Sequence, residues 1–177
     1  MQPSSPKLSP CLGCGAMLPV NARASIGATH DYLLASAECW ATFGEVLARE
    51  YSNAAYAKVH RLTVDAYAVQ HPGHPSPQSI QSVTLHLISL CLVLECGFDM
   101  DQATRTMQRL ARHKSDFVWL TPPNSLGDKT ILDVWQAPDA IAHVKAVEEW
   151  AQSAWSAWES HHPQVRQWTL DWALNCA

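Results

Sequence analysis

The sequence predicts a mainly α protein, a helical bundle of five to six helices with an N-terminal zinc-knuckle-like segment and one small β-hairpin. Three observations support this. Apolar residues recur at helical spacing through most of the chain after residue 36. Hydrophobic residues make up 47% of the 177 residues and eight residues are tryptophan, which is ample for an aromatic core. A Cys-x-x-Cys pair precedes the first predicted helix.

Start and stop signals place the helices. Ser36 is a typical N-cap for the first helix, and Pro72 with Gly73 ends the second. Gly97 ends the third, whose apolar residues on most sides indicate a central helix, and Pro138 suits the start of the fifth. We expect helices at about 37–51, 54–71, 78–96, 101–113, 138–161 and 163–174.

One stretch has strand-like rather than helical composition. Residues 117–120 and 130–135 are rich in Val, Ile, Leu and Trp, and the loop at 121–128 between them is rich in turn residues. We therefore expect the β-hairpin at 117–135.

Composition limits the other possibilities. Residues 1–10 hold three Pro and three Ser and predict a flexible tail, which leaves 11–177 as a single helical domain with a metal-binding segment at 11–39. The formal net charge of −4 makes nucleic acid an unexpected partner. The most apolar run, Val83–Leu94, is shorter than the roughly 20 residues that cross a bilayer, and no signal peptide is recognised. We expect no membrane association and a cytoplasmic protein whose cysteines are thiols or metal ligands.

Cys11-Leu-Gly-Cys-Gly15 is the strongest chemical motif. Cys11 and Cys14 are three positions apart and can reach one ion, and Gly13 and Gly15 allow the tight backbone that such a turn needs. A redox dithiol is the alternative, but the βαβ context of a thioredoxin-like motif is missing. No second Cys-x-x-Cys follows, so the remaining ligands must come from elsewhere.

Cys39 and His71 are the favoured third and fourth ligands. Cys39 falls in the first turn of the first helix, where the helix dipole favours a thiolate, although a buried thiol is the alternative. His71 lies at the end of the second helix, where a histidine is also often a simple cap. His30 and His74 are rivals, and His60 is less favoured because it lies about 16 Å from His71 along one helix. The sequence thus predicts a structural Cys3His zinc site that anchors the N-terminal segment to a helical body.

A metal-dependent enzyme is the alternative function, of hydrolase or thiol-transferase type. Its histidine-lined pocket would lie between helices, with candidate catalytic residues His60, Tyr67, His86 and His161 or His162. A lone histidine such as His86 is more often a hydrogen-bonded core residue. No phosphate loop, nucleophile elbow or His-Glu-x-x-His motif is present, so several large enzyme classes are disfavoured.

Two further features have ordinary interpretations. Arg61 and Asp65 are four apart on one helix and predict a surface ion pair, unless Asp65 faces inward and orients a neighbouring histidine. The C-terminal helices hold five tryptophans, which predict core packing or, if exposed, a surface for a protein partner. They are Trp150, Trp155, Trp158, Trp168 and Trp172.

Several blocks of the chain resemble a bacterial family of uncharacterised proteins, the domain of unknown function numbered 5946. The blocks are Cys11-Leu-Gly-Cys-Gly15, Cys39-Trp-Ala, Val59-His-Arg-Leu-Thr-Val-Asp-Ala-Tyr-Ala-Val-Gln-His-Pro-Gly73, His86-Leu-Ile-Ser-Leu, Thr121-Pro-Pro and the Trp/His-His C-terminal block. Leu12 replaces the proline that usually follows the first cysteine. The resemblance implies that these blocks belong to one intact domain, and it implies no reaction.

Overall fold

Eight α-helices and one two-stranded antiparallel sheet make up the part of the chain that this computed structural model describes, residues 7–20 and 29–174. In chain order the elements are β1 (Leu8–Pro10), β2 (Met17–Pro19), α1 (Ala37–Ser52), α2 (Ala54–Ala57), α3 (His60–Gln70), α4 (Pro77–Leu94), α5 (Met100–Leu110), α6 (Ile131–Trp135), α7 (Ala140–Ala157) and α8 (His162–Trp168). Short 3₁₀ turns at Ala111–His113 and Glu159–His161 and a π-helical turn at Thr169–Leu174 complete the described part.

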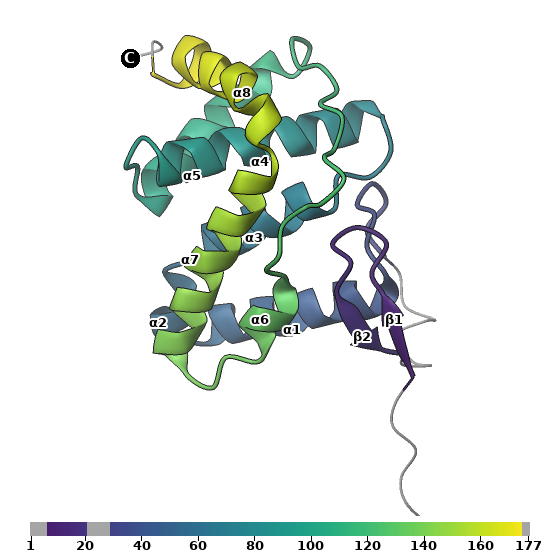
Figure 1. The fold of residues 1–177 in the computed structure, drawn as a ribbon. Coiled ribbons are helices and arrows are strands. Elements are labelled where there is room, and N and C mark those ends of the chain that lie inside the picture. The colour runs from purple at the N-terminus through teal and green to yellow at the C-terminus, as the bar shows by residue number, and fades with distance from the viewer. Residues whose placement is uncertain (1–6, 21–28, 175–177) are drawn as a thin grey trace, which may run out of the picture.

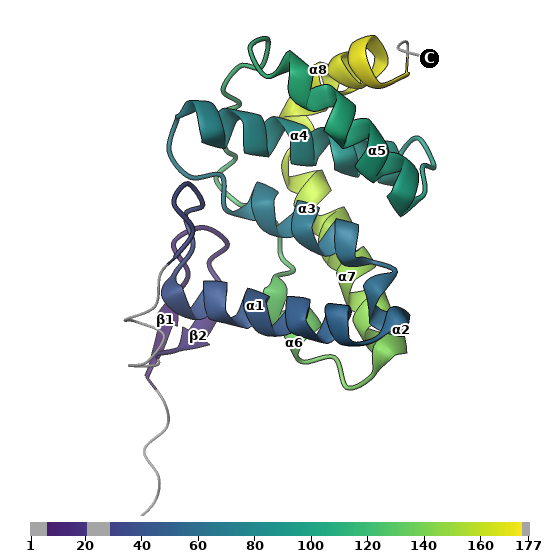
Figure 2. The same ribbon diagram turned by 180° about the vertical axis from the view of Figure 1, so that it is seen from behind.

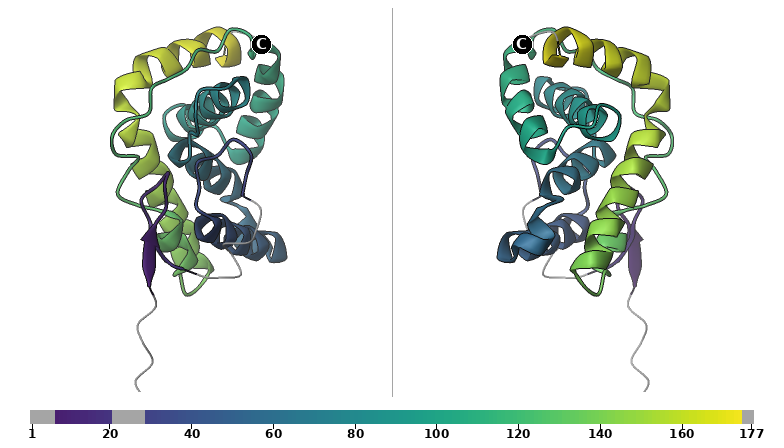
Figure 3. Two further views of the ribbon diagram at one scale, coloured as in Figure 1. Left: turned by 90° about the vertical axis from the view of Figure 1, so that its right-hand side faces the viewer. Right: turned by 90° about the vertical axis from the view of Figure 1, so that its left-hand side faces the viewer.

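The helices form a stack that one long helix crosses. α1, α3 and α4 lie one above another in Figures 1 and 2, and α7 runs across them. α3 packs against both α4 and α7, while α5 and α8 cover other sides of α4. Figure 3 shows α7 and α8 following one flank of the molecule. The small sheet lies beside the start of α1, so it projects from one end of the helical body.

Local capping explains where several helices begin. The Ser36 hydroxyl accepts a hydrogen bond from the backbone N–H of Cys39 at 3.2 Å and starts α1, as predicted. Ser76 and Asp139 cap α4 and α7 in the same way. These caps satisfy backbone N–H groups that the first helical turn leaves without a partner.

The predicted mainly helical fold is confirmed, and the six predicted helices correspond to the longer observed ones. The predicted second helix is divided into α2 and α3 by a turn at Lys58 and Val59. α4 is the central helix, as expected, and its Leu87, Ile88 and Leu92 are fully buried. By length and composition α4 also passes a test for a membrane span, at 18 residues and a mean hydropathy of 1.3. Half of it is buried within the fold.

The position of the β-hairpin was predicted wrongly. Residues 131–135 form helix α6 because the side chains of Thr130 and Asp133 make a reciprocal capping box. Ile131 and Val134 are buried at helical spacing on its inner face. Residues 117–120 have no regular secondary structure, although Phe117 and Leu120 are buried.

The observed hairpin flanks the Cys-x-x-Cys motif instead. β1 pairs with β2 in the register Leu8↔Pro19, Ser9↔Leu18 and Pro10↔Met17. Residues 8–10 are thus part of the sheet rather than of the predicted flexible tail, and residues 1–6 of that tail lie outside the described residues. Backbone hydrogen bonds of the turn stabilise this pairing. Such bonds do not require alternating apolar side chains, so the sequence showed no strand pattern here.

The tryptophans of the C-terminal helices pack in the core. Trp150, Trp155, Trp158 and Trp168 are buried, and Trp172 is half-buried. The indole N–H of Trp158 donates to the Val69 carbonyl at 3.2 Å, so the ring is fixed to α3. These four rings therefore serve packing and do not form an exposed partner surface.

Gln70 joins three segments at the end of α3. Its side chain is fully buried, and its amide oxygen accepts from the Trp150 indole at 2.8 Å. Its amide nitrogen donates to the carbonyls of Leu126 at 2.8 Å and Lys129 at 2.7 Å. One side chain thus fixes the 121–129 loop and α7 against the residue that precedes His71.

We expect Gln70→Leu to lower the free energy of unfolding by about 2–4 kcal/mol, because it removes the partner of the buried Trp150 indole and of two part-buried carbonyls, those of Leu126 and Lys129. Urea unfolding followed by circular dichroism measures this. The exposed Gln152→Leu is the matched control and should change stability by less than about 0.5 kcal/mol. Equal effects of the two substitutions would contradict the bridging role of Gln70.

Asp65 joins α3 to α4. Its predicted ion pair with Arg61 is present, but the pair does not lie on the surface as expected, because Asp65 is fully buried. The Arg61 guanidinium contacts both carboxylate oxygens, the His86 Nδ1 lies 2.7 Å from Oδ1, and the Ser89 hydroxyl donates to Oδ2 at 2.5 Å. Asp65 therefore orients a histidine of the neighbouring helix. Burial alone would raise the pKa of Asp65, but the hydrogen bond with His86 and the charge of Arg61 outweigh burial and hold this pKa below its ordinary value.

A carboxyl group whose pKa is lowered by folding contributes stability above its unfolded pKa, and this stability is lost as pH falls through the folded value. We therefore expect Asp65→Asn to destabilise the protein by about 3 kcal/mol at pH 7. The difference from wild type should shrink as pH falls below about 4. Urea unfolding at pH 7, 5 and 3 tests this, with the exposed Asp116→Asn as control. A difference that does not depend on pH would contradict it.

Candidate metal centre

The turn between β1 and β2 presents two cysteine side chains on one side. The backbone N–H of Cys11 donates to the Ala16 carbonyl at 2.9 Å, and the N–H of Gly15 donates to the Cys11 carbonyl at 3.0 Å. Gly15 has φ of +74°, a left-handed conformation that favours glycine. The turn is therefore the knuckle that the sequence motif predicted, with Cys11 buried and Cys14 partly exposed.

The first turn of α1 supplies a third sulfur. Cys39 is fully buried three residues after the N-cap Ser36. The positive end of the helix dipole favours a thiolate at this position. The backbone N–H of Ser36 also donates to the Cys11 sulfur at 3.4 Å, so the start of α1 contacts the knuckle directly.

The end of α3 supplies an imidazole in a defined orientation. His71 is the C-cap of α3 and is fully buried. Its Nδ1 lies 2.7 Å from the carbonyl of Tyr67, and a carbonyl only accepts, so Nδ1 carries the proton. Nε2 faces the sulfurs and, in the neutral ring, presents its lone pair to them, which is the arrangement of metal-binding histidines with a carbonyl partner. The Tyr67 hydroxyl donates to the Cys39 sulfur at 3.6 Å.

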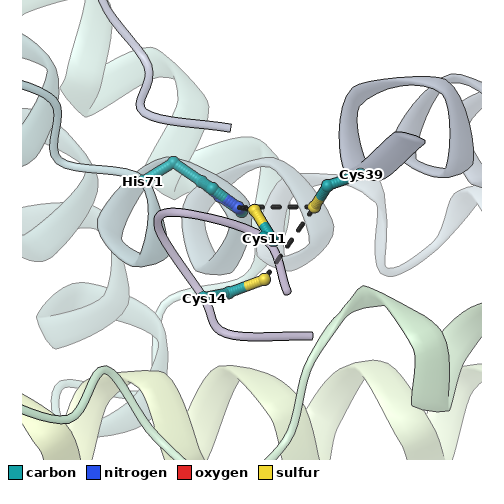
Figure 4. Close-up of side chains that lie close together, drawn as sticks. All are labelled: Cys11, Cys14, Cys39 and His71. Carbon is teal, nitrogen blue, oxygen red and sulfur yellow. Dashed lines mark hydrogen bonds between the residues drawn. The ribbon is translucent and has the colours of Figure 1, made fainter. Parts of the chain in front are cut away.

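These four side chains converge on one point (Figure 4). Their donor atoms all lie within 4.8 Å of one another. His71 Nε2 is 3.5 Å from the Cys11 sulfur and 3.4 Å from the Cys39 sulfur, and the sulfurs of Cys14 and Cys39 are 3.8 Å apart. Ordinary zinc bond lengths in a tetrahedron give edges of about 3.8 Å between sulfurs and about 3.5 Å between sulfur and nitrogen. The donors therefore fit a tetrahedral metal ion.

The donors also shift one another's protonation. Hydrogen bonds from Cys14 and Cys39 lower the pKa of Cys11 far below its ordinary value, whereas the hydrogen bonds with Cys11 and Cys14, together with burial, raise the pKa of Cys39. Burial alone would lower the pKa of His71, but hydrogen bonds with Cys11 and Cys14 outweigh it and raise this pKa to about 9. The cluster thus favours a thiolate at Cys11, the form that binds metals.

Gly13 allows the knuckle to approach the end of α3. A Cβ atom at Gly13 would lie 2.5 Å from Cδ2 of His71 and 2.9 Å from the Gln70 carbonyl oxygen, and it would overlap the Leu34 carbonyl oxygen. Only glycine fits this contact without movement of backbone atoms. The glycine between the two cysteines therefore has a steric role in bringing Cys11 and Cys14 to His71.

The rival histidines lie outside the donor cluster. His30 contacts the rings of Tyr32 and Trp40, with ring centroids 4.3 Å and 5.3 Å away. His74 lines a hollow of about 380 Å³ beside Tyr32.

The four candidate catalytic residues do not meet in one pocket within the described residues. His60 is hydrogen-bonded to Glu50, His86 to Asp65 and His162 to the Trp155 carbonyl. Tyr67 instead contacts Cys39, one of the four donor residues. His161, the other C-terminal candidate, bonds to the carbonyl of Thr121. Each histidine serves a separate contact, so the expected histidine-lined pocket is not formed by these side chains.

Sequence reasoning missed two buried residues: Glu50, which contacts His60, and His143, which contacts Glu50. Glu50 is 1% exposed and accepts hydrogen bonds from the Thr63 hydroxyl at 2.5 Å and from the fully buried His143 at 3.0 Å. The signal for Glu50 was its helical spacing from Phe43 and Val46 on the buried face of α1. His143 carried no comparable signal.

Comparison with known proteins adds a family but no activity. No curated protein and no solved structure matches the chain. The model of the family of unknown function DUF5946 matches residues 9–159, a range that contains all four donors and most of the helical body. The family named from the sequence blocks is therefore the family found, and the chain belongs to the family of unknown function DUF5946.

Proposed function

We propose that this protein is a zinc-binding module in which Cys11, Cys14, Cys39 and His71 hold one structural Zn²⁺. The observation that carries the proposal is the convergence of four donor atoms within 4.8 Å from three separate segments. Three thiolates and one neutral imidazole in a tetrahedron are typical of zinc rather than of magnesium or calcium, which prefer oxygen ligands.

The shape of the site supports a structural rather than a catalytic ion. All four positions of the tetrahedron have a protein donor, and three of the four donor residues are buried. A catalytic zinc usually keeps one position for water or substrate. The ion would supply a divalent positive charge that holds thiolates together, and no reaction step is assigned to it.

Zinc would stabilise the N-terminal hairpin. Each strand has only three residues, and a two-stranded sheet of this size is marginal by itself in water. The ligands join this hairpin to α1 and to the end of α3, so metal binding energy becomes folding energy of the segment. We also propose a cytoplasmic setting, because a reducing compartment keeps such cysteines available as thiolates.

We expect about one zinc per purified chain and a more than about 100-fold loss of zinc affinity in Cys14→Ser and in His71→Gln, because each removes a donor. Mass spectrometry of metals and competition with a chromophoric chelator measure this. Cys96→Ser is the matched control, since Cys96 is exposed and lies outside the cluster, and it should bind zinc like wild type. Wild-type protein that takes up no zinc when zinc is supplied would refute the proposal.

We expect Gly13→Ala to lower zinc affinity at least about tenfold and stability by about 1–3 kcal/mol, because the added methyl group displaces His71 or the knuckle. The same chelator competition and urea unfolding measure both effects. Gly44→Ala is the control, because a Cβ at Gly44 meets no atom within 4 Å in the interior of α1. This control should raise stability by up to about 1 kcal/mol through helix propensity. Unchanged zinc affinity in Gly13→Ala would show that the close contact does not position the ligands.

A further inference from the structure

A second chemical cluster lies at the far end of α1, where a buried carboxylate contacts two imidazoles. Glu50 is 1% exposed, and its ion pairs within the described residues are both with histidines, His60 at 2.7 Å and His143 at 3.0 Å. A buried carboxylate is costly unless its oxygens accept hydrogen bonds. Thr63 supplies a third hydrogen bond to Glu50, at 2.5 Å.

The proton positions follow from Glu50, because an ionised carboxylate only accepts hydrogen bonds. His60 Nδ1 therefore donates to Glu50, and in the neutral ring Nε2 keeps a lone pair. The Tyr51 hydroxyl lies 3.1 Å from this Nε2. The hydroxyl thus donates to His60, and the chain of contacts runs from a surface phenol through an imidazole to a buried carboxylate.

Tyr51, His60 and Glu50 differ in their exposure to solvent. Tyr51 is 75% exposed, so a reagent or another molecule has access to its phenol oxygen. The His60 side chain is 29% exposed, and the Glu50 side chain is shielded completely. The ring of His60 also contacts the Tyr51 ring, with centroids 4.8 Å apart, which limits the motion of both.

We propose that Tyr51 is an activated nucleophile and a site of acyl, sulfonyl or phosphoryl modification, with His60 as its general base and Glu50 as the residue that positions His60. The bond from the Tyr51 oxygen to the electrophile forms while the bond from the electrophile to its leaving group breaks. The phenol proton moves to Nε2 of His60, and the leaving group departs with its electron pair. Glu50 stabilises the imidazolium that results, which is the part a buried carboxylate plays in hydrolase triads.

Because its position on α1 does not activate it, Tyr51 needs His60 as a general base to react faster than a free tyrosine. Tyr51 lies in the last turn of α1, away from the positive end of the helix dipole. Exposure alone therefore gives Tyr51 no more than the reactivity of a free tyrosine. Removal of the proton by a positioned imidazole is worth about 10²- to 10⁴-fold in general base catalysis. The proposal is independent of the zinc site, because none of these residues belongs to that cluster.

The test uses 4-(2-aminoethyl)benzenesulfonyl fluoride as the probe. Its sulfur–fluorine bond breaks as the oxygen–sulfur bond forms, and fluoride leaves. Peptide mapping by mass spectrometry follows the sulfonylation of Tyr51, with N-acetyltyrosinamide in the same solution as the reference. We expect Tyr51 of the wild-type protein to react at least about tenfold faster than the reference.

Variants distinguish general-base catalysis by His60 from an effect of the exposure of Tyr51 alone. His60→Gln should return the rate of Tyr51 to that of the reference, and Tyr51→Phe should abolish labelling at this position. His113→Gln, which removes a histidine stacked on Trp172, is the matched control and should leave the rate unchanged. Circular dichroism and zinc content confirm that each variant is folded. A wild-type rate equal to the reference, or an unchanged rate in folded His60→Gln, overturns the proposal.

Discussion

The junction between the knuckle, the start of α1 and the end of α3 is the constraint on which the N-terminal part of the structure depends. Cys11 and Cys14 come from the turn of a very short hairpin, and their partners lie 25 to 60 positions away in the chain. Few apolar residues of the hairpin reach the core, Leu18 being one of them. Contacts among the three sulfurs and the imidazole thus stabilise the hairpin, as a larger hydrophobic face stabilises a longer sheet.

α3 organises the polar interior of the helical body. Its first residue, His60, contacts Glu50 of α1, and Asp65 contacts Arg61 of the same helix and His86 of α4. Gln70 then fixes α7 and the 121–129 loop, and His71 follows at the donor cluster. A helix with buried polar groups on several faces shows little amphipathic pattern, and each of its contacts has a defined geometry. Such contacts specify one arrangement of neighbouring helices, because an unmatched buried polar group is costly.

Much of the fold was predictable because helix signals are local. The cap at Ser36, the Pro-Gly turn after His71 and the apolar pattern of α4 each act within a few residues. The error at residues 130–135 came from composition, since Ile, Val and Trp are common in strands. The spacing of Ile131 and Val134 and the Thr130–Asp133 box outweigh that preference, and both were visible in the sequence. The Arg61–Asp65 pair shows the opposite case, because spacing on a helix does not tell which face is buried.

By itself the sequence determined the longer helices, the family and the first two donors, since a Cys-x-x-Cys turn with glycines is a local geometric device. Only the tertiary structure decided that Cys39 and His71, and not His30 or His74, complete the donor set. It alone also placed the buried carboxylates of Glu50 and Asp65 against histidines. The physical reason is that distances between segments far apart in the chain depend on how whole helices pack. Short-range periodicity in the sequence does not predict these distances.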